Sequence, residues 1–420
     1  MMHASTSASA RPLCRLLVAT GITNIGDGIR LVALPLLATR LTTDPALITG
    51  VVVADRLPWL LFLLPGGALA DRFDRVRIRV RLDWFRAAIA VALAGFVLAA
   101  ETTLVILYVA TILMSAAEAI VDSSSMAMLP SMVDPDRLEA ELGRLSATEI
   151  IGRELCGPVV GGALFAATAG LPFTVDAISF AASAAIIAAM APASIRTAAP
   201  APPVGVRAAT TEMRRSIAHG MAWLWRQPAL RALALLTTAL SVAAFALVSV
   251  MVIFATDDLG LSAAGFGLLM IPTAVGGLLG TWIAPRLRHL PLAAVVGGAV
   301  TITGVADMLI ARSDSVGVVA SLLVLDTGGV LVWNVLTVAY RQRLIPDEVR
   351  GRVGASFRFL LSLGAPVGAF IAGAATRAGG ARPTILAAGI TTTALGLFAI
   401  PVLTRHTHRK EIAMRPRTFA

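Results

Sequence analysis

Residues 66–77 read Gly66-Gly67-Ala68-Leu69-Ala70-Asp71-Arg72-Phe73-Asp74-Arg75-Val76-Arg77, a short and densely charged stretch. It lies between two long apolar runs, at about 46–69 and 83–100. Each run is long enough to cross about 30 Å of hydrocarbon as a helix. The charges are therefore expected at a membrane boundary, in a loop between two membrane-spanning helices.

Composition extends this prediction to the whole chain. The 420 residues are 57% hydrophobic and 14% charged, with a mean hydropathy of +0.82, whereas soluble domains are about a quarter charged. The apolar runs are too long and too uniform for barrel strands. The sequence predicts an all-α polytopic membrane protein with twelve transmembrane helices, near 16–39, 46–69, 83–100, 103–126, 144–167, 172–191, 229–255, 263–284, 291–311, 316–340, 353–375 and 383–403.

The basic residues that give the net charge of +10 are concentrated in the loops between the predicted spans. Counted from an inside N-terminus, 27 basic residues fall on one side and four on the other. Those after the second span are Arg72, Arg75, Arg77, Arg79, Arg81 and Arg86. This bias places both termini in the cytoplasm. We therefore interpret the charge as topology and contact with the lipid bilayer, with no nucleic acid as partner, and we expect a bacterial cytoplasmic membrane protein.

The opening stretch has the pattern Gly-x-x-x-Asp-Arg-x-x-Arg, at Gly67, Asp71, Arg72 and Arg75, with Arg77 following. This resembles the signature between helices 2 and 3 of the major facilitator superfamily, a family of secondary transporters. The resemblance implies two six-helix halves and a gating role for these residues. It also implies that the Asp71 carboxylate faces the positive N-terminus of helix 11. The alternative is a charged loop that only orients helices 2 and 3. The basic run departs from the commoner unbroken one at Val76.

An acid stands in the middle of the first span, within Asn24-Ile25-Gly26-Asp27-Gly28-Ile29-Arg30. A charged group at mid-span costs at least ~2.5–3.5 kcal/mol, so it usually faces a partner or a cavity. Asp27 and Arg30 are three residues apart on one helix face and can pair. Either they form a structural ion pair, or Asp27 is a proton or cation site whose protonation releases Arg30.

Three further acids and a base lie inside the fourth and fifth spans. Glu118 and Asp122 share one helix face, where repulsion and burial favour a proton on one of them; we expect Glu118 to carry it. Glu149 and Arg153 are spaced to form an internal pair. In the second half, Asp326 and Arg358 are expected to pair likewise. For each group, plain structural pairing is the alternative to ion coupling.

The fifth span contains Gly157-Pro158-Val159-Val160-Gly161-Gly162. Small residues four apart let helices approach closely, and Pro158 bends a helix. The segment resembles the antiporter motif of exporters in the same superfamily, with Cys156 where that motif prefers Gly. The alternative is glycine-rich packing unrelated to transport direction.

Other segments resemble one branch of that superfamily, the macrolide-efflux and enterobactin-exporter-like proteins. They are Gly26-Asp27, Leu57-Pro58, Asp83 with Arg86, residues 219–228 and residues 345–353. The resemblance spans nearly the whole chain and implies drug:proton antiport.

The chain is expected to divide into four parts. These are an N-terminal six-helix half at 1–191, a cytoplasmic linker at 192–228, a C-terminal half at 229–404 and a basic tail at 405–420. Within the linker, 210–225 is expected to be an amphipathic helix, lying either on the inner membrane face or in solvent.

We therefore expect a non-enzymatic secondary transporter. It would export a bulky amphipathic small molecule, such as a drug or siderophore, by proton antiport, as a monomer without cofactor or metal. The alternatives are an uptake symporter of the same fold and a non-transporting membrane receptor or scaffold. The candidates for lining the substrate cavity are Asn24, Trp59, Tyr108, Trp333, Asn334 and Arg358.

Overall fold

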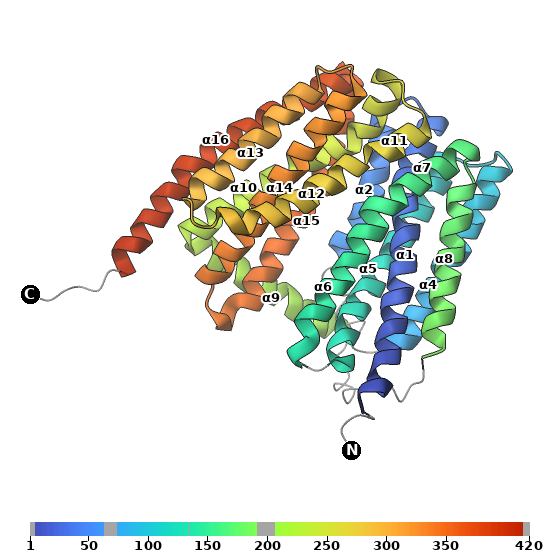
Figure 1. The fold of residues 1–420 in the computed structure, drawn as a ribbon, viewed down its shortest axis with the longest axis horizontal. Helices are drawn as coiled ribbons and strands as arrows, with labels where there is room; N and C mark the ends of the chain where they lie inside the picture. The colour runs from blue at the N-terminus through green and yellow to red at the C-terminus, as the bar shows by residue number, and fades with distance from the viewer. Residues whose placement is uncertain (1–4, 63–73, 134, 191–205, 415–420) are drawn as a thin grey trace, which may run out of the picture. The chain divides into compact units, whose positions relative to one another are not determined.

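The computed structural model describes residues 5–62, 74–133, 135–190 and 206–414. Every regular element in these ranges is helical, and Figure 1 shows the helices as long rods. The all-α prediction is therefore confirmed. The described residues contain ten helical stretches that are long and apolar enough to cross a membrane, so this is a multi-pass membrane protein.

Two predicted spans, 46–69 and 83–100, are not among those ten. The described part of helix α2 (Pro45–Phe62) has only 18 residues. Helix α4 (Arg75–Leu98) begins eight residues earlier than predicted and is charged over its first half, with the three buried residues Arg79, Asp83 and Arg86. These charges lower its hydropathy, although it packs against α5 and α8.

The chain folds into two compact units. Unit 1 comprises Met1–Arg214 and Ala255–Ile271. Its remaining helices are α1 (Ser5–Leu41), α5 (Leu104–Met132), α6 (Leu138–Glu149), the π-helical turn η2 (Ile150–Cys156), α7 (Gly157–Ala167), α8 (Leu171–Ala188) and α11 (Ala263–Leu269), with the 3-10 turn η1 (Pro135–Arg137) before α6 and the π-turn η4 (Phe254–Asp258) at the unit boundary. Helix α1 packs against α2, α5, α7 and α8, so it is central to this unit.

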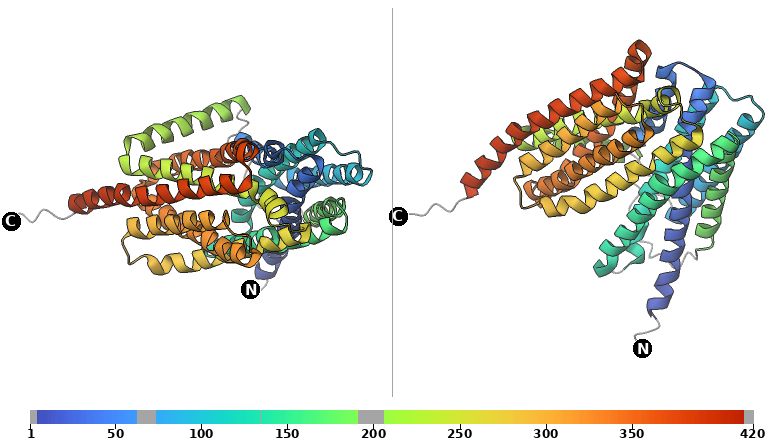
Figure 2. Two further views of the ribbon diagram at one scale, coloured as in Figure 1. Left: turned by 90° about the horizontal axis from the view of Figure 1, so that it is seen from above. Right: turned by 45° about the horizontal axis from the view of Figure 1, so that its top comes forward.

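Unit 2 comprises Arg215–Phe254 and Pro272–Ala420. Its helices are α10 (Pro228–Ile253), α12 (Ile271–Ile283), α13 (Leu292–Ile310), α14 (Val316–Leu344), α15 (Asp347–Gly379) and α16 (Ala381–Met414), with the 3-10 turn η5 (Ala284–Leu287) after α12. Helix α13 packs along both α14 and α16, and the right view of Figure 2 shows α16 running beside it. The four-part division predicted from the sequence stays a prediction.

Local sequence accounts for several helix ends. Asp74 caps α4, because its side chain accepts hydrogen bonds from the backbone N–H groups of Val76 and Arg77, at 3.0 and 3.3 Å. Thr103 caps α5 in the same way through the N–H of Ile106. Such caps satisfy backbone donors that have no partner within the helix.

The predicted linker helix is present as α9 (Val206–Arg226). Its side chain Leu224 is fully buried among Ile345, Val353 and Phe357. The hydroxyl of Ser356 on α15 donates to the carbonyl of Ile217, at 3.2 Å. The C-terminal part of α9 is therefore packed on unit 2, so neither a fully solvated helix nor one held only by lipid describes it.

Candidate functional site: a buried charge network in unit 1

The predicted contact between Asp27 and Arg30 is present, at 3.1 Å between Oδ1 and Nη2. Arg30 is 2% exposed and contacts three further carboxylates. They are Asp55 of α2 at 3.4 Å, Glu118 of α5 and Asp176 of α8 at 3.8 Å. One guanidinium therefore links four helices, because its five donors point in several directions at once.

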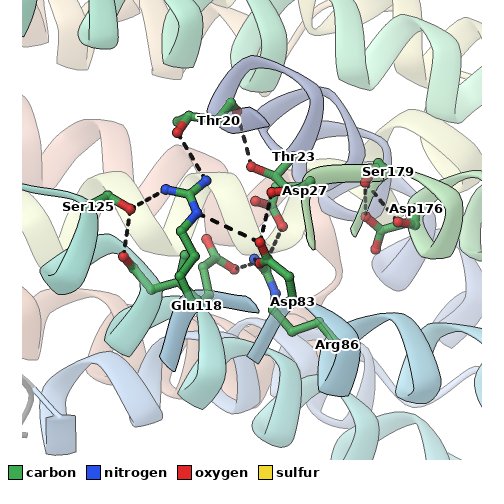
Figure 3. A network of polar contacts seen from close by, with 12 residues as sticks. Thr20, Thr23, Asp27, Asp83, Arg86, Glu118, Ser125, Asp176 and Ser179 are labelled. Carbon is green, nitrogen blue, oxygen red and sulfur yellow. Dashed lines mark hydrogen bonds and ion pairs between the residues drawn. The ribbon is translucent and has the colours of Figure 1, made fainter. Parts of the chain in front are cut away.

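Glu118 is contacted by three guanidiniums. Arg153 of η2 donates to its Oε1 at 2.5 Å, and Arg30 and Arg86 approach Oε2, the latter at 3.6 Å. Arg86 also donates to Asp27 and lies over the ring of Phe180, with 3.9 Å between its Cζ and the centroid. Figure 3 shows Asp27, Arg86 and Glu118 converging.

A second guanidinium of α4 extends the network. Arg79 donates to the hydroxyls of Thr20 and Ser125 and lies 3.7 Å from Asp83. The hydroxyl of Ser183 donates to Asp83 at 2.7 Å. Arg79 and Asp83 are 1% and 0% exposed. Polar atoms this deeply buried need partners, because an unpaired charge in apolar surroundings is very costly.

We refer to these nine charged residues as the buried charge network: Asp27, Arg30, Asp55, Arg79, Asp83, Arg86, Glu118, Arg153 and Asp176. It holds five carboxylates and four guanidiniums. A fifth guanidinium, that of Arg56 in α2, lies 3.3 Å from Asp55 at the edge of the network, so the acidic and basic groups balance when all are ionised.

Sequence reasoning missed much of this network. It counted Arg79 and Arg86 only among the basic residues that follow the second span, whereas both are 1% exposed and paired inside unit 1. It also missed Asp55 and Asp176. Both are acids within predicted apolar spans, and that position alone marks a functional candidate.

Two pairings predicted from the sequence are wrong. Arg153 contacts Glu118 instead of Glu149, because the π-helical turn η2 follows Glu149 directly and its wider turn shifts side chains four apart off a common face. Glu149 and Asp122 are exposed. Arg358 is exposed too, and among the described residues it forms no ion pair with Asp326.

Part of the proposed gating motif lies outside the described residues, namely Gly67, Asp71 and Arg72. Arg75 and Arg77 lie in the first turn of α4, and Arg77 is 3.5 Å from Asp74. The gating role of all five residues stays a prediction.

The antiporter-like motif lies in close helix contacts. A Cβ on Gly157 would lie 2.5 Å from the Cα of Gly28, and one on Gly161 would lie 2.6 Å from the carbonyl of Ile29. A Cβ on Gly28 would in turn lie 2.5 Å from the carbonyl of Arg153. These glycines therefore bring η2 and α7 against α1, which brings Arg153 into the network. Gly162 faces Gly267 of α11, and Pro158 also contacts Gly267.

The cavity candidates have varied surroundings. Asn24 donates to Thr148 of α6 at 3.2 Å, and Tyr108 donates to the carbonyl of Leu47 at 2.5 Å. Trp333 is 3% exposed within a hydrophobic cluster of unit 2, as an aromatic core residue would be. Trp59 and Asn334 are partly buried. Their roles in substrate binding stay predictions.

Apolar helices packed around buried ion pairs are typical of polytopic membrane transporters. Residues 16–369 match the family model of the Major Facilitator Superfamily, so the chain belongs to this family and is a transporter, not an enzyme. The chain is similar to the "Multidrug efflux pump Tap" of Mycobacterium tuberculosis, 28% identical over 410 residues that cover 93% of each protein. The protein of the same name from Mycolicibacterium fortuitum is 25% identical, over 94% of this chain and 96% of its own.

Solved structures show the same fold. A bacterial homologue of the iron transporter ferroportin, in an inward-facing state, superposes with a TM-score of 0.70 at 19% identity, over 94% of this chain and 98% of its own. The structure of the peptide transporter POT superposes with a TM-score of 0.74 at 14% identity, over 93% of this chain and 94% of its own. At these identities the likeness concerns the fold alone.

Proposed function

We propose that this transporter exports a bulky amphipathic small molecule, drug-like or siderophore-like, in exchange for protons. The observation that carries the proposal is that five carboxylates lie in the buried charge network and that one of them, Asp176, is weakly paired, through the 3.8 Å approach of Arg30. Binding a proton to one carboxylate changes the charge of the network. The helices that the network links therefore have different electrostatic energies in the loaded and unloaded states.

Within the network, Asp176 is the least strongly paired carboxylate. Among the described residues, its only ion-pair contact is the 3.8 Å approach of Arg30, and its Oδ2 accepts no hydrogen bond from them. Glu118, in contrast, is contacted by three guanidiniums. A proton binds most readily where the fewest cations compete with it. We therefore assign proton binding to Asp176 and a structural part to Glu118, whereas Asp27 is held by Arg30 and Arg86.

The energetics of exchange are sufficient for useful export. A motive force of ~150 mV supplies about 3.5 kcal/mol per proton. Since ~1.4 kcal/mol corresponds to a factor of ten, one proton sustains a substrate gradient of roughly a few hundredfold. Export as the direction is supported by the relatives named multidrug efflux pumps, which align along nearly the whole chain. The uneven distribution of basic residues supports a bacterial cytoplasmic membrane with both termini inside.

The test uses an efflux-deficient bacterial host that carries the full chain or variants of it. Susceptibility is measured for macrolides, for amphipathic dyes such as ethidium and for catecholate siderophores. We expect the wild type to raise resistance to at least one of these, and Asp27→Asn and Asp176→Asn to abolish the gain. The matched control is Asp314→Asn, because the Asp314 side chain is 88% exposed in the loop between α13 and α14.

Everted vesicles settle the direction and the coupling ion. Adding the transported solute should dissipate a preformed pH gradient in wild-type vesicles and not in Asp176→Asn vesicles. Solute uptake into whole cells would instead identify an importer. Solute export that is independent of the pH gradient would refute proton coupling.

A further inference from the structure

We propose that Asp307 of α13 and Asp326 of α14 form a second proton-binding site, located within unit 2 and separate from the buried charge network. The part that this site plays in transport rests on the function proposed above, whereas its existence does not. No step assigned to unit 1 involves these two residues.

Asp307 is a buried carboxylate without compensation. It is 3% exposed, and its Oδ1 has no hydrogen-bond partner. Asp307 and Asp326 lie within α13 and α14, both of which are apolar enough to cross a membrane. Neither residue forms an ion pair with any of the residues that the structure describes. An acid at such a position usually has a functional role.

The packing of α13 on α14 brings the two acids together. The hydroxyl of Thr303 donates to the backbone carbonyl of Asp326, at 3.0 Å. Asp307 follows Thr303 by four residues and therefore lies one turn further along the same face.

The side chains of the two acids lean toward each other. A Cβ on Gly329 would lie 2.8 Å from the carbonyl of Ala299, so later residues of α14 lie beside earlier residues of α13, and the helices are antiparallel. The Cα–Cβ bonds of a helix tilt toward its N-terminus. The tilt therefore directs Asp307 toward the level of Asp326, and Asp326 toward the level of Asp307.

The charged groups on the helices next to Asp307 and Asp326 lie away from these two residues. On α16, Arg382 in the first turn binds Asp314 and the carbonyl of Ala311, beyond the end of α13. On α14, Arg341 and Arg343 lie in the last turn, four helical turns from Asp326. Arg312 is exposed in the loop after α13. On the side of α16, the neighbour of Asp307 is Gly389. Among the described residues, neither carboxylate is therefore paired with a cation.

Two carboxylates close together in apolar surroundings hold one proton between them, because like charges at short range cannot both remain ionised. A metal ion fits the site less well. Ions such as calcium take six to eight oxygen ligands, and no cluster of three or more His, Cys, Asp or Glu side chains suited to a metal occurs among the described residues. The proton is the ligand that needs only these two groups.

Infrared spectroscopy of the full-length protein in lipid tests the site directly. The wild type at neutral pH should show the carbonyl stretch of a protonated carboxyl group. Asp307→Asn should remove the absorption of about one such group per molecule, and Asp326→Asn should shift or remove it, because the proton loses its second carboxylate. The control Asp314→Asn alters an exposed, ion-paired carboxylate and should remove none.

A wild-type spectrum without this absorption would overturn the proposal, and this measurement needs no variant. So would an unchanged absorption in whichever variant folds, as judged by circular dichroism. Transport is measured separately in vesicles. If the infrared difference is found while wild-type vesicles show no proton-driven transport, the proposed function fails and the proton site stands.

Discussion

Arg30 of α1 donates to Glu118 of α5 across the interior of unit 1, and both side chains are almost completely buried, at 2% and 1% exposure. The two residues are 88 positions apart in the chain. Arg30 also contacts Asp27, Asp55 and Asp176. One guanidinium thus links α1 to three neighbouring helices.

Replacing Arg30 by Gln should destabilise the protein strongly. Four carboxylates would lose a cationic partner, and breaking a buried ion pair costs about 3–5 kcal/mol. The free energy of unfolding, measured in detergent micelles, should fall by about that amount. Arg312→Gln is the matched control, since Arg312 is exposed and surface changes usually stay within about 0.5 kcal/mol. Equal effects of the two variants would contradict the central position of Arg30.

The close approach of α7 to α1 predicts opposite results for two Gly→Ala changes within helical segments. A methyl group on Gly157 would meet the Cα of Gly28 at 2.5 Å, whereas one on Gly143 would meet nothing within 4 Å. Overpacking costs about 1–3 kcal/mol, so Gly157→Ala should lower the unfolding free energy by that range. Gly143→Ala should be neutral or stabilising, because Ala favours helix. A tolerated Gly157→Ala would show that α1 and α7 can move apart without loss.

The hydroxyl of Ser183 should matter more than an exposed hydroxyl on a helix. Ser183 is 0% exposed and donates to Asp83 at 2.7 Å. Removing it by Ser183→Ala leaves a buried carboxylate with one donor fewer, which costs about 1–3 kcal/mol. Ser321→Ala removes only a hydrogen bond to the carbonyl of Gly317 at an exposed position and should change the unfolding free energy by less than about 0.5 kcal/mol. Indistinguishable unfolding curves would argue against the contact with Asp83.

The ring of Phe180 should stabilise Arg86 beyond its apolar packing. The guanidinium lies 3.9 Å from the ring centroid in a buried position, where a cation–π contact contributes up to about 2 kcal/mol. Phe180→Leu keeps an apolar side chain but removes the aromatic face, and should cost more than Phe398→Leu at a site 60% exposed. Thermal unfolding of the two variants in detergent gives the comparison. A similar loss in both would leave the ring with a packing role only.

Much of the fold follows from local sequence. Hydrophobic runs of about 20 residues predict transmembrane helices wherever they occur, and ten of the twelve predicted spans coincide with helical stretches of the described residues that are long and apolar enough to cross a membrane. The pair Asp27 and Arg30 was also predictable, because residues three apart on one helix lie side by side whatever the surroundings. The glycine spacing of 157–162 indicated close helix packing for the same reason.

The partners from other helices were not predictable in this way. Arg153 is placed beside Glu118, and away from Glu149, by a π-helical turn and by the contact of Gly157 with Gly28. Nothing in the spacing of the sequence indicates that turn. Likewise, Asp326 had an expected partner in Arg358, but Arg358 is exposed, and Asp326 lies where α14 packs on α13, with its backbone carbonyl accepting a hydrogen bond from Thr303.

By itself, the sequence determined the helical membrane class and the helix-local contacts, because hydrophobic length and helix periodicity are properties of contiguous residues. Only the tertiary structure decided which charges meet in the interior. Ion pairs between helices depend on helix rotation and separation, and these are fixed by small-residue contacts that lie far apart in the chain.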